Sequence, residues 1–173
     1  MPANSNALRE FLVTIRLATD DDKDAIWAIL EPMIRRGDTY TLPREMGKSQ
    51  ALEFWFAAGN ETFVWQDGGA ILGTYFLRAN QRGGGAHVAN CGYVTAEGAE
   101  GRGIARAMCL HSLQRSRERD FRAMQFNFVV STNERAVKLW RDLGFDIVGR
   151  LPGAFQHPEH GFVDALVMYK QLT

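Results

Sequence analysis

Val94-Thr95-Ala96-Glu97-Gly98-Ala99-Glu100-Gly101-Arg102-Gly103-Ile104-Ala105-Arg106-Ala107-Met108 is the stretch that decides the fold. An apolar segment from Ala86 to Val94 precedes it and an amphipathic pattern follows, so the order is strand, glycine-rich turn, helix. Gly101 and Gly103 can adopt positive φ and let a ligand approach the backbone closely. The amides from Gly101 to Arg106 would then converge on a phosphate at the positive end of the helix dipole. The stretch predicts a phosphate cradle, and the alternative is a plain strand-to-helix turn.

A second block, about 30 residues further along the chain, has the features of a capped amphipathic helix. It reads Asn133-Glu134-Arg135-Ala136-Val137-Lys138-Leu139-Trp140-Arg141-Asp142-Leu143-Gly144-Phe145. Asn133 is a strong helix N-cap, and Gly144 is a typical helix stop. The helical spacing between them predicts one apolar face, formed by Ala136, Leu139, Trp140 and Leu143.

The two blocks together resemble the GNAT superfamily of acyl-CoA-dependent N-acyltransferases. The loop pattern of that family is Gln/Arg-x-x-Gly-x-Gly/Ala, and positions 100–105 here read Glu-Gly-Arg-Gly-Ile-Ala. The helix pattern is Asn-x-x-Ala-x-x-Leu-Tyr-x-x-x-Gly-Phe, matched from Asn133 to Phe145 with Trp140 in the place of Tyr. Glu100 stands where the family usually has Gln or Arg. A carboxylate beside a pyrophosphate is repulsive unless it points away or pairs with Arg102 or Arg106.

The resemblance covers Leu12 to Lys170 and implies an α/β (α+β) GNAT fold. In that fold a mixed, mostly antiparallel sheet is splayed in the middle and flanked by about four helices. The expected strands are Phe11–Leu17, Glu61–Gln66, Ala70–Arg78, Ala86–Val94, Ala123–Val130, Phe145–Arg150 and Phe162–Lys170. The expected helices run from Ala18 to about Gly37, from Lys48 to Ala58, from the cradle to about Arg119, and onward from Asn133. We expect residues 1–10 to form a flexible leader and residues 11–173 to form one N-acetyltransferase domain.

The resemblance also implies acetyl-CoA as co-substrate, with its pyrophosphate at the cradle and its pantetheine in the splay. The pantetheine would pair with exposed backbone around Tyr93, Val94 and Thr95, as an added strand does. The implied cofactor-binding residues are Val94, Thr95, Gly101, Arg102, Gly103, Ile104, Ala105, Arg106 and Asn133. For the side chains of Arg102 and Arg106, the alternative is a solvated position at the start of the helix.

Three residues are candidates for the chemistry: Asn90, Asn127 and Trp140. The family's proton donor to the leaving sulfur is often the Tyr that Trp140 replaces. An indole N–H donates a hydrogen bond but is far too weak an acid to give up its proton. Trp140 therefore either stabilises a thiolate or only packs under the cofactor, and Tyr93 and Ser131 are weaker candidates for the acid. Asn90 and Asn127 either pair with each other or donate to a carboxylate or carbonyl of the substrate.

The acceptor is expected to be the amine of a small molecule. The residues expected to bind it are Tyr40, Trp55, Phe155 and His157. His157 could also act as a base through water, and the alternative is a solvated histidine in a loop that runs from Pro152 to His160. The His-x-x-His spacing there lacks further ligands, so no metal is expected.

The nature of that acceptor follows from a narrower resemblance. The loop from Arg36 to Tyr40, the pair Trp55-Phe56 and the two asparagines Asn90 and Asn127 are most similar to the subgroup that acetylates amino acids and analogues such as phosphinothricin. An amino acid or analogue is thus the expected acceptor. Three alternatives stay open: a protein or peptide amine as acceptor, a non-catalytic acyl-CoA-binding module, and a structural or oligomerisation domain.

Composition limits the remaining possibilities. The 173 residues carry a formal net charge of zero, which does not favour a nucleic-acid or membrane surface as partner. Cys91 and Cys109 are too few for a disulfide framework and lie in apolar segments, so we expect reduced core thiols and a cytoplasmic location. No apolar run is long enough to span a bilayer. A homodimer is expected only by analogy with the family.

Overall fold

The computed structural model describes residues 13–173, and the expected leader at residues 1–10 and the expected strand start at Phe11 lie outside this range. The strands are β1 (Val13–Leu17), β2 (Glu61–Asp67), β3 (Ala70–Ala79), β4 (Val88–Thr95), β5 (Ala123–Val130), β6 (Asp146–His157) and β7 (Gly161–Gln171). The α-helices are α1 (Lys23–Arg36), α2 (Lys48–Trp55), α3 (Ile104–Glu118) and α4 (Glu134–Asp142). Two short 3-10 turns cover Asp20–Asp22 and Gly83–Gly85.

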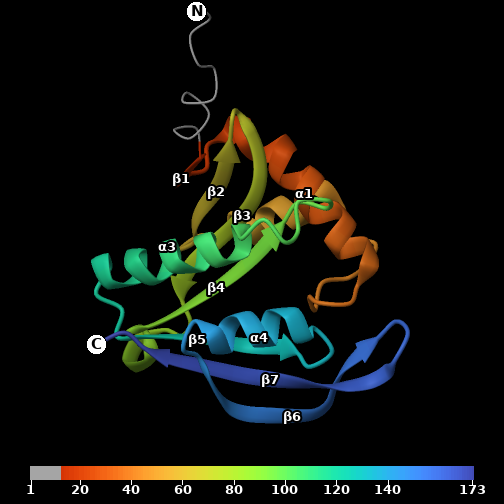
Figure 1. Ribbon diagram of the computed structural model, residues 1–173, viewed down its shortest axis with the longest axis vertical. Coiled ribbons are helices and arrows are strands. Elements are labelled where there is room, and N and C mark those ends of the chain that lie inside the picture. Colours follow the sequence, from red (N-terminus) through yellow and green to blue (C-terminus); the bar gives the residue numbers. More distant parts are fainter. Residues whose placement is uncertain (1–12) are drawn as a thin grey trace, which may run out of the picture.

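The strands form one seven-stranded sheet in the order β1-β2-β3-β4-β5-β7-β6. All neighbours are antiparallel except β4 and β5, which are parallel. The β4–β5 ladder contains only the pairs Val88–Ala123 and Ala89–Met124, after which the strands diverge (Figure 1). This confirms the predicted mixed sheet that is splayed in its middle.

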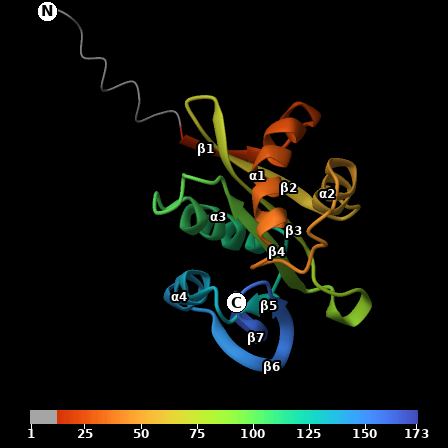
Figure 2. The ribbon, with the colours of Figure 1, turned by 90° about the vertical axis from the view of Figure 1, so that its right-hand side faces the viewer.

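The helices cover both faces of this sheet, with α1 and α2 on one side and α3 and α4 on the other (Figure 2). Each face has its own apolar core. One core gathers α1 and α2 against β2, β3 and β4, and Trp55 lies in it with no exposed surface. The other packs α3 and α4 against the opposite faces of β2–β5 and β7. On β4 the side chains alternate between the two cores, because Cys91 belongs to the second and Val94 to the first.

The start of α1 is fixed by a buried carboxylate. Asp22 is 6% exposed, and it accepts hydrogen bonds from both terminal nitrogens of Arg16, at 2.7 and 2.8 Å, and from the Thr19 amide at 2.7 Å. These contacts hold the pKa of Asp22 at about 2, mainly through the hydrogen bond from Arg16. The helix ends at Gly37, whose φ of 64° supplies the left-handed cap.

The end of the chain differs from the prediction. β6 continues to His157 and pairs with β7 as far as Gly161, so the expected long loop from Pro152 to His160 is mostly strand. A register shift between Leu151 and Phe155 lets Pro152 sit in this edge strand. The helix α2 is also shorter than expected, ending at Trp55. No helix within residues 13–173 has the length and apolar character needed to cross a bilayer.

Candidate active site

The glycine-rich loop has the backbone conformation that the sequence predicts. Gly101 and Gly103 have φ values of 78° and 77°, which side-chain-bearing residues rarely adopt. A Cβ at either position would meet nothing within 4 Å, so the loop is open to an approaching ligand. The first helical hydrogen bond of α3 runs from the Ala107 amide to the Gly103 carbonyl at 2.9 Å. The amides that precede Ala107 therefore have no partner within the helix, which is the arrangement that can bind an anion.

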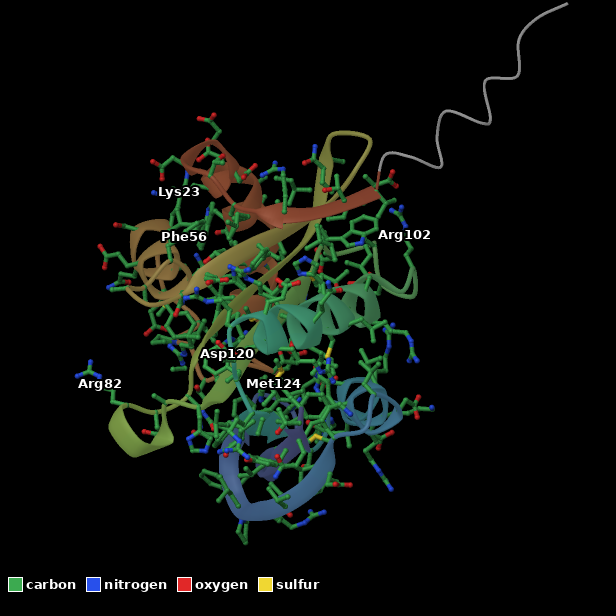
Figure 3. The ribbon with its side chains drawn as sticks, turned by 90° about the vertical axis from the view of Figure 1, so that its left-hand side faces the viewer. Lys23, Phe56, Arg82, Arg102, Asp120 and Met124 are labelled. Carbon is green, nitrogen blue, oxygen red and sulfur yellow. The ribbon has the colours of Figure 1, made fainter. Side chains whose placement is uncertain are left out.

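The charged side chains near this loop divide into two groups. Arg102 turns toward the end of β2, where it forms an ion pair with Asp67 at 3.0 Å and lies over the ring of Trp65 (Figure 3). Glu100 is exposed and forms no ion pair with Arg102 or Arg106. Pairing with Arg102 or Arg106 is thus not how the charge of this carboxylate is offset in residues 13–173. The guanidinium of Arg102 is directed away from a phosphate, which leaves only its amide for the cradle.

Basic side chains of α3 and α4 gather around Asp142. Lys138 donates a hydrogen bond to Asp142 at 2.6 Å and thereby lowers the pKa of that carboxyl. The positive charges of Arg106 and Arg141 lower the same pKa further, because both lie close to Asp142. Arg106 is exposed, so its charge is available to a phosphate on this side of the molecule.

A cavity of about 330 Å³ opens where β4 and β5 part. Its lining comes from the loop between α1 and α2, from α2 itself, from β3, β4 and β5, and from α4 with its N-cap. Among the lining residues are Tyr40, Phe76, Arg78, Asn90, Asn133 and Trp140. The cavity therefore joins the face that carries α1 and α2 to the face that carries α3 and α4. Its size is in the range of small-ligand sites.

The two asparagines both line this cavity but do not bond to each other. Asn90 donates from Nδ2 to the carbonyl of Gln125 at 3.0 Å, immediately beyond the last β4–β5 pair. Asn127 donates to the side chain of Asn80 at 2.6 Å and accepts from Gln125 at 2.8 Å. A bulge in β5 between Phe126 and Val129 accompanies the exposed position of Asn127. The alternative of a direct Asn90–Asn127 pair is therefore wrong.

Of the residues expected to contact the acceptor, Tyr40 lines the cavity but Trp55 does not. Trp55 is fully buried, and its indole N–H donates to the Thr74 hydroxyl at 2.9 Å. The prediction that Trp55 contacts the acceptor is wrong, since the helical turn of α2 directs its neighbour Phe54 into the cavity instead. Phe56 lies elsewhere, with Lys23 5.5 Å above its ring (Figure 3).

Phe155 and His157 do not line the cavity either. Phe155 is 7% exposed and packs behind Phe128, with ring centroids 6.2 Å apart. His157 lies at the β6–β7 turn, where its Nδ1 accepts from the amides of Glu159 and His160. Both predictions fail for one reason: the segment is a strand and its turn, rather than a loop that folds over the splay. Within residues 13–173 no group of three or more His, Cys, Asp or Glu is arranged to hold a metal ion.

Arg78 is the residue of this site that the sequence reasoning missed. It lies near the end of β3, lines the cavity, and carries the only charge among the lining residues that the structure describes. Its Nε donates to Asn90 at 3.4 Å, and its guanidinium lies 5.0 Å from the centroid of Phe76. No carboxylate of residues 13–173 forms an ion pair with it. The sequence signal that could have identified Arg78 is its charge within an otherwise apolar, buried strand.

Comparisons with known proteins identify the family and the fold. A family model described as acetyltransferase (GNAT) family matches residues 26–145. The chain belongs to the GNAT acetyltransferase family. A solved GCN5-related N-acetyltransferase from Kribbella flavida is 38% identical, with a TM-score of 0.88, and the match covers 92% of this chain and 98% of that one. The curated N-acetyltransferase aca1 of Schizosaccharomyces pombe is 24% identical over 153 residues, 78% of this chain and 72% of the relative.

A third match comes from a GNAT enzyme with its cofactor bound. The phosphinothricin acetyltransferase from Sinorhizobium meliloti, solved in complex with acetyl-CoA, is 20% identical with a TM-score of 0.80, over 93% of this chain and 89% of that one. At this identity the match shows the shared fold. Family membership makes this chain an acetyl-CoA-dependent N-acetyltransferase, and the open glycine loop with its free amides fits a pyrophosphate.

Trp140, which stands where the GNAT helix pattern has Tyr, lines the cavity. It is 8% exposed, and its ring centroid is 5.2 Å from that of Tyr93 and 5.0 Å from that of Phe126. Its indole N–H donates to no other group of residues 13–173. The hydroxyl of Tyr93 is engaged with Ser112 at 2.7 Å in the core, and Ser131 lies outside the cavity beside α4. Neither is therefore placed to replace the usual tyrosine.

Proposed function

We propose that this N-acetyltransferase acetylates the amine of a small molecule that also carries an anionic group, of the amino-acid type. The observation that carries the proposal is Arg78, a cationic side chain in the cavity without a carboxylate partner in the described chain. A planar guanidinium can bind a carboxylate through two parallel hydrogen bonds. Asn90 already orients the Nε of Arg78, which leaves the terminal nitrogens for a ligand.

The surroundings of Arg78 support an amino acid over a polycation. No Asp or Glu appears among the described residues that line the cavity, so a polyamine or aminoglycoside would find no counter-charge there. Tyr40, Phe54 and Phe76 supply aromatic walls on the same side. These walls would enclose the side chain of an acceptor while its carboxylate meets Arg78.

The cofactor contacts proposed here come from backbone and from few side chains. The amides from Gly101 to Arg106 would hold the pyrophosphate, and Arg106 would add charge. The backbone of Val94 and Thr95 would pair with the pantetheine, and Asn133, whose Oδ1 accepts from the Ala136 amide at 3.3 Å, would hold the start of α4 in place beside it. When bound, acetyl-CoA supplies an acyl thioester, which is open to attack by a neutral amine.

The role proposed for Trp140 is that of a hydrogen-bond donor to sulfur. Its indole N–H lacks a partner within the described residues and lies at the cavity, so it can stabilise negative charge on a leaving thiolate. It transfers no proton. A thiol with a pKa of about 8.5 needs little assistance to leave, and its proton can come from water.

The test compares amino acids with their amides as acceptors. Wild-type protein is expected to release thiol from acetyl-CoA with at least one amino acid, and about tenfold or more slowly with the corresponding amino-acid amide, because the amide lacks the charge that Arg78 binds. Arg78→Gln should abolish that preference and raise KM for the acid alone. Equal rates for acid and amide would contradict the proposal. Acetyl-CoA binding without turnover on any amine would favour a non-catalytic binding module.

Two further proposals concern the setting of the protein. Cys91 and Cys109 are free and buried, which supports a reducing compartment such as the cytoplasm. Burial raises the pKa of both thiols to about 12, so neither is a nucleophile at neutral pH. Assembly as a homodimer is proposed by family analogy, and light scattering on purified protein tests it.

A further inference from the structure

The Tyr40 hydroxyl occupies a distinctive place at the splay. It donates a hydrogen bond to the main-chain carbonyl of Tyr93 at 3.1 Å. That carbonyl belongs to β4 beyond Ala89, in the part of the strand where pairing with β5 has ended. Tyr40 itself comes from the loop between α1 and α2, so a side chain of the acceptor face reaches the edge of β4 inside the cavity.

This contact fixes the direction of the hydroxyl hydrogen. A carbonyl oxygen can only accept, so the single hydrogen of Tyr40 points at Tyr93 and the phenolic oxygen keeps its lone pairs for another donor. The hydroxyls of Tyr75 and Tyr93 differ, because their partners, His111 Nδ1 at 2.6 Å and Ser112 Oγ at 2.7 Å, can each donate or accept. Among these three tyrosines, only Tyr40 presents a defined hydrogen-bond acceptor.

The packing around Tyr40 holds that acceptor in place. Its ring lies against Trp55, with centroids 6.3 Å apart. On the other side is Gly92, where a Cβ would come within 2.9 Å of the Tyr40 hydroxyl and 2.7 Å of the Phe76 ring. The hydroxyl therefore reaches the Tyr93 carbonyl only because residue 92 has no side chain. Burial raises the pKa of Tyr40, so the group stays a neutral phenol throughout the working pH range.

We propose that the Tyr40 oxygen accepts a hydrogen bond from an N–H of the acceptor amine and thereby aims the nitrogen lone pair at the thioester. An amine held by one N–H has its lone pair directed away from that contact, which is the orientation that attack requires. This inference rests on the proposed function, and Arg78 would hold the other end of the same molecule.

The accompanying step balances without a proton from Tyr40. The nitrogen lone pair forms the new N–C bond, and the acyl C–S bond breaks with its electron pair going to sulfur. The amine loses its surplus proton to water, and the thiolate takes one from water at a pH below its pKa. Tyr40 keeps its own hydrogen on the Tyr93 carbonyl throughout, so it acts as a hydrogen-bond acceptor and not as a base.

The test uses Tyr40→Phe in the full chain, with Tyr75→Phe as the matched control. Both changes delete one hydrogen-bonded hydroxyl, but Tyr75 is fully buried and does not line the cavity, whereas half-buried Tyr40 does. In Tyr40→Phe, calorimetry on the cofactor-free protein should show acceptor binding weakened about threefold to tenfold, as for one lost hydrogen bond. The value of kcat should fall by a factor of about 10 to 100, because the amine is no longer aimed. Acetyl-CoA affinity should stay unchanged in both variants.

A second variant tests the position of the Tyr40 hydroxyl instead of its presence. Gly92→Ala keeps the Tyr40 hydroxyl but adds a methyl group within 2.9 Å of it, so the hydroxyl must shift. This variant should therefore weaken acceptor binding, as Tyr40→Phe does. Wild-type acceptor affinity and turnover in Tyr40→Phe would overturn the inference and leave the proposed function intact. Weakened acetyl-CoA binding in Tyr40→Phe would also overturn it, by assigning the hydroxyl to the cofactor. Absence of turnover by the wild-type protein on every amine would overturn the proposed function and this inference together.

Discussion

The two sides of the splay are built in different ways. The proposed cofactor side depends on backbone: two glycines with positive φ, the free amides at the start of α3, and the exposed edge of β4. The acceptor side depends on side chains from separate elements, among them Tyr40 from a loop, Arg78 from β3 and Asn90 from β4. A backbone site can hold the same ligand in many family members, whereas a side-chain site can change its ligand through single substitutions. Single substitutions should therefore alter the proposed acceptor side more readily than the proposed cofactor side.

The largest effect is expected in the core behind the cavity, from Trp55→Ala. Removing this fully buried indole also removes its hydrogen bond to Thr74, so the free energy of unfolding should fall by about 3–5 kcal/mol. Urea denaturation measures it. Phe54→Ala, in the half-buried neighbour that lines the cavity, should cost clearly less stability and more acceptor affinity. If Trp55→Ala instead lost more acceptor affinity than Phe54→Ala, Trp55 would contact the acceptor after all.

A smaller loss in the free energy of unfolding is expected when Asp22, the carboxylate at the start of α1, is replaced. The folded pKa of Asp22 is about 2 against an ordinary 3.8, so its charged form stabilises the fold above about pH 4, and that contribution disappears as pH falls through 2. The difference corresponds to about 2 kcal/mol. Asp22→Asn should lower stability at pH 6 by this order and flatten the pH dependence of unfolding between pH 4 and 2. An unchanged pH slope in the variant would show that other carboxylates dominate.

The backbone nature of the cofactor side is tested by Gly103→Ala. Alanine at a φ of 77° costs about 1–2 kcal/mol, which the loop can relieve by moving its amides. Acetyl-CoA affinity should therefore fall about tenfold in calorimetry. Gly98→Ala is the control, since Gly98 has a φ of 79° in the same loop but precedes the cradle. Gly98→Ala should lose similar stability and keep its affinity for acetyl-CoA. An equal loss of acetyl-CoA affinity in both variants would mean that the whole loop, and not the cradle alone, determines cofactor binding.

The smallest change is expected from Asn127→Ala. The side chain is exposed and bonds to Asn80 and Gln125 at the rim of the cavity. We expect stability within about 0.5 kcal/mol of wild type, and a KM for the acceptor raised by about twofold to threefold through the loosened rim. Steady-state kinetics gives the value. A loss of tenfold or more would place Asn127 in direct contact with the acceptor and revise the side-chain map proposed here.

The sequence predicts the glycine-rich turn and the limits of α4 well because their signals are local. Gly101 and Gly103 alone specify the turn, and the Asn133 and Gly144 caps delimit α4 with little help from the rest of the chain. The splay was accessible through family resemblance, and the two-pair ladder between β4 and β5 confirms it.

The acceptor side was predicted less well because tertiary packing decides it. Trp55 and Phe54 are neighbours on one short helix, and only the rotation of α2 against β3 determines which of them is buried. Phe155 was misplaced because Gly153 and Pro152 suggested a loop, whereas pairing with β7 extends the strand through them. Arg78 could have been noticed as a charge in a buried strand, but its free guanidinium is visible only in three dimensions.

The short ladder between β4 and β5 has a mechanical consequence. Within residues 13–173, Val88–Ala123 and Ala89–Met124 are the only register pairs that join the two halves of the sheet, and both lie at one end of the strands. Under tension across the sheet, rupture is expected to begin along this line, since every other strand pair has a longer ladder. A ligand that pairs with the free edge of β4 would bridge the open part of that line. Single-molecule pulling should therefore register cofactor as an increase in the force at which the protein first yields.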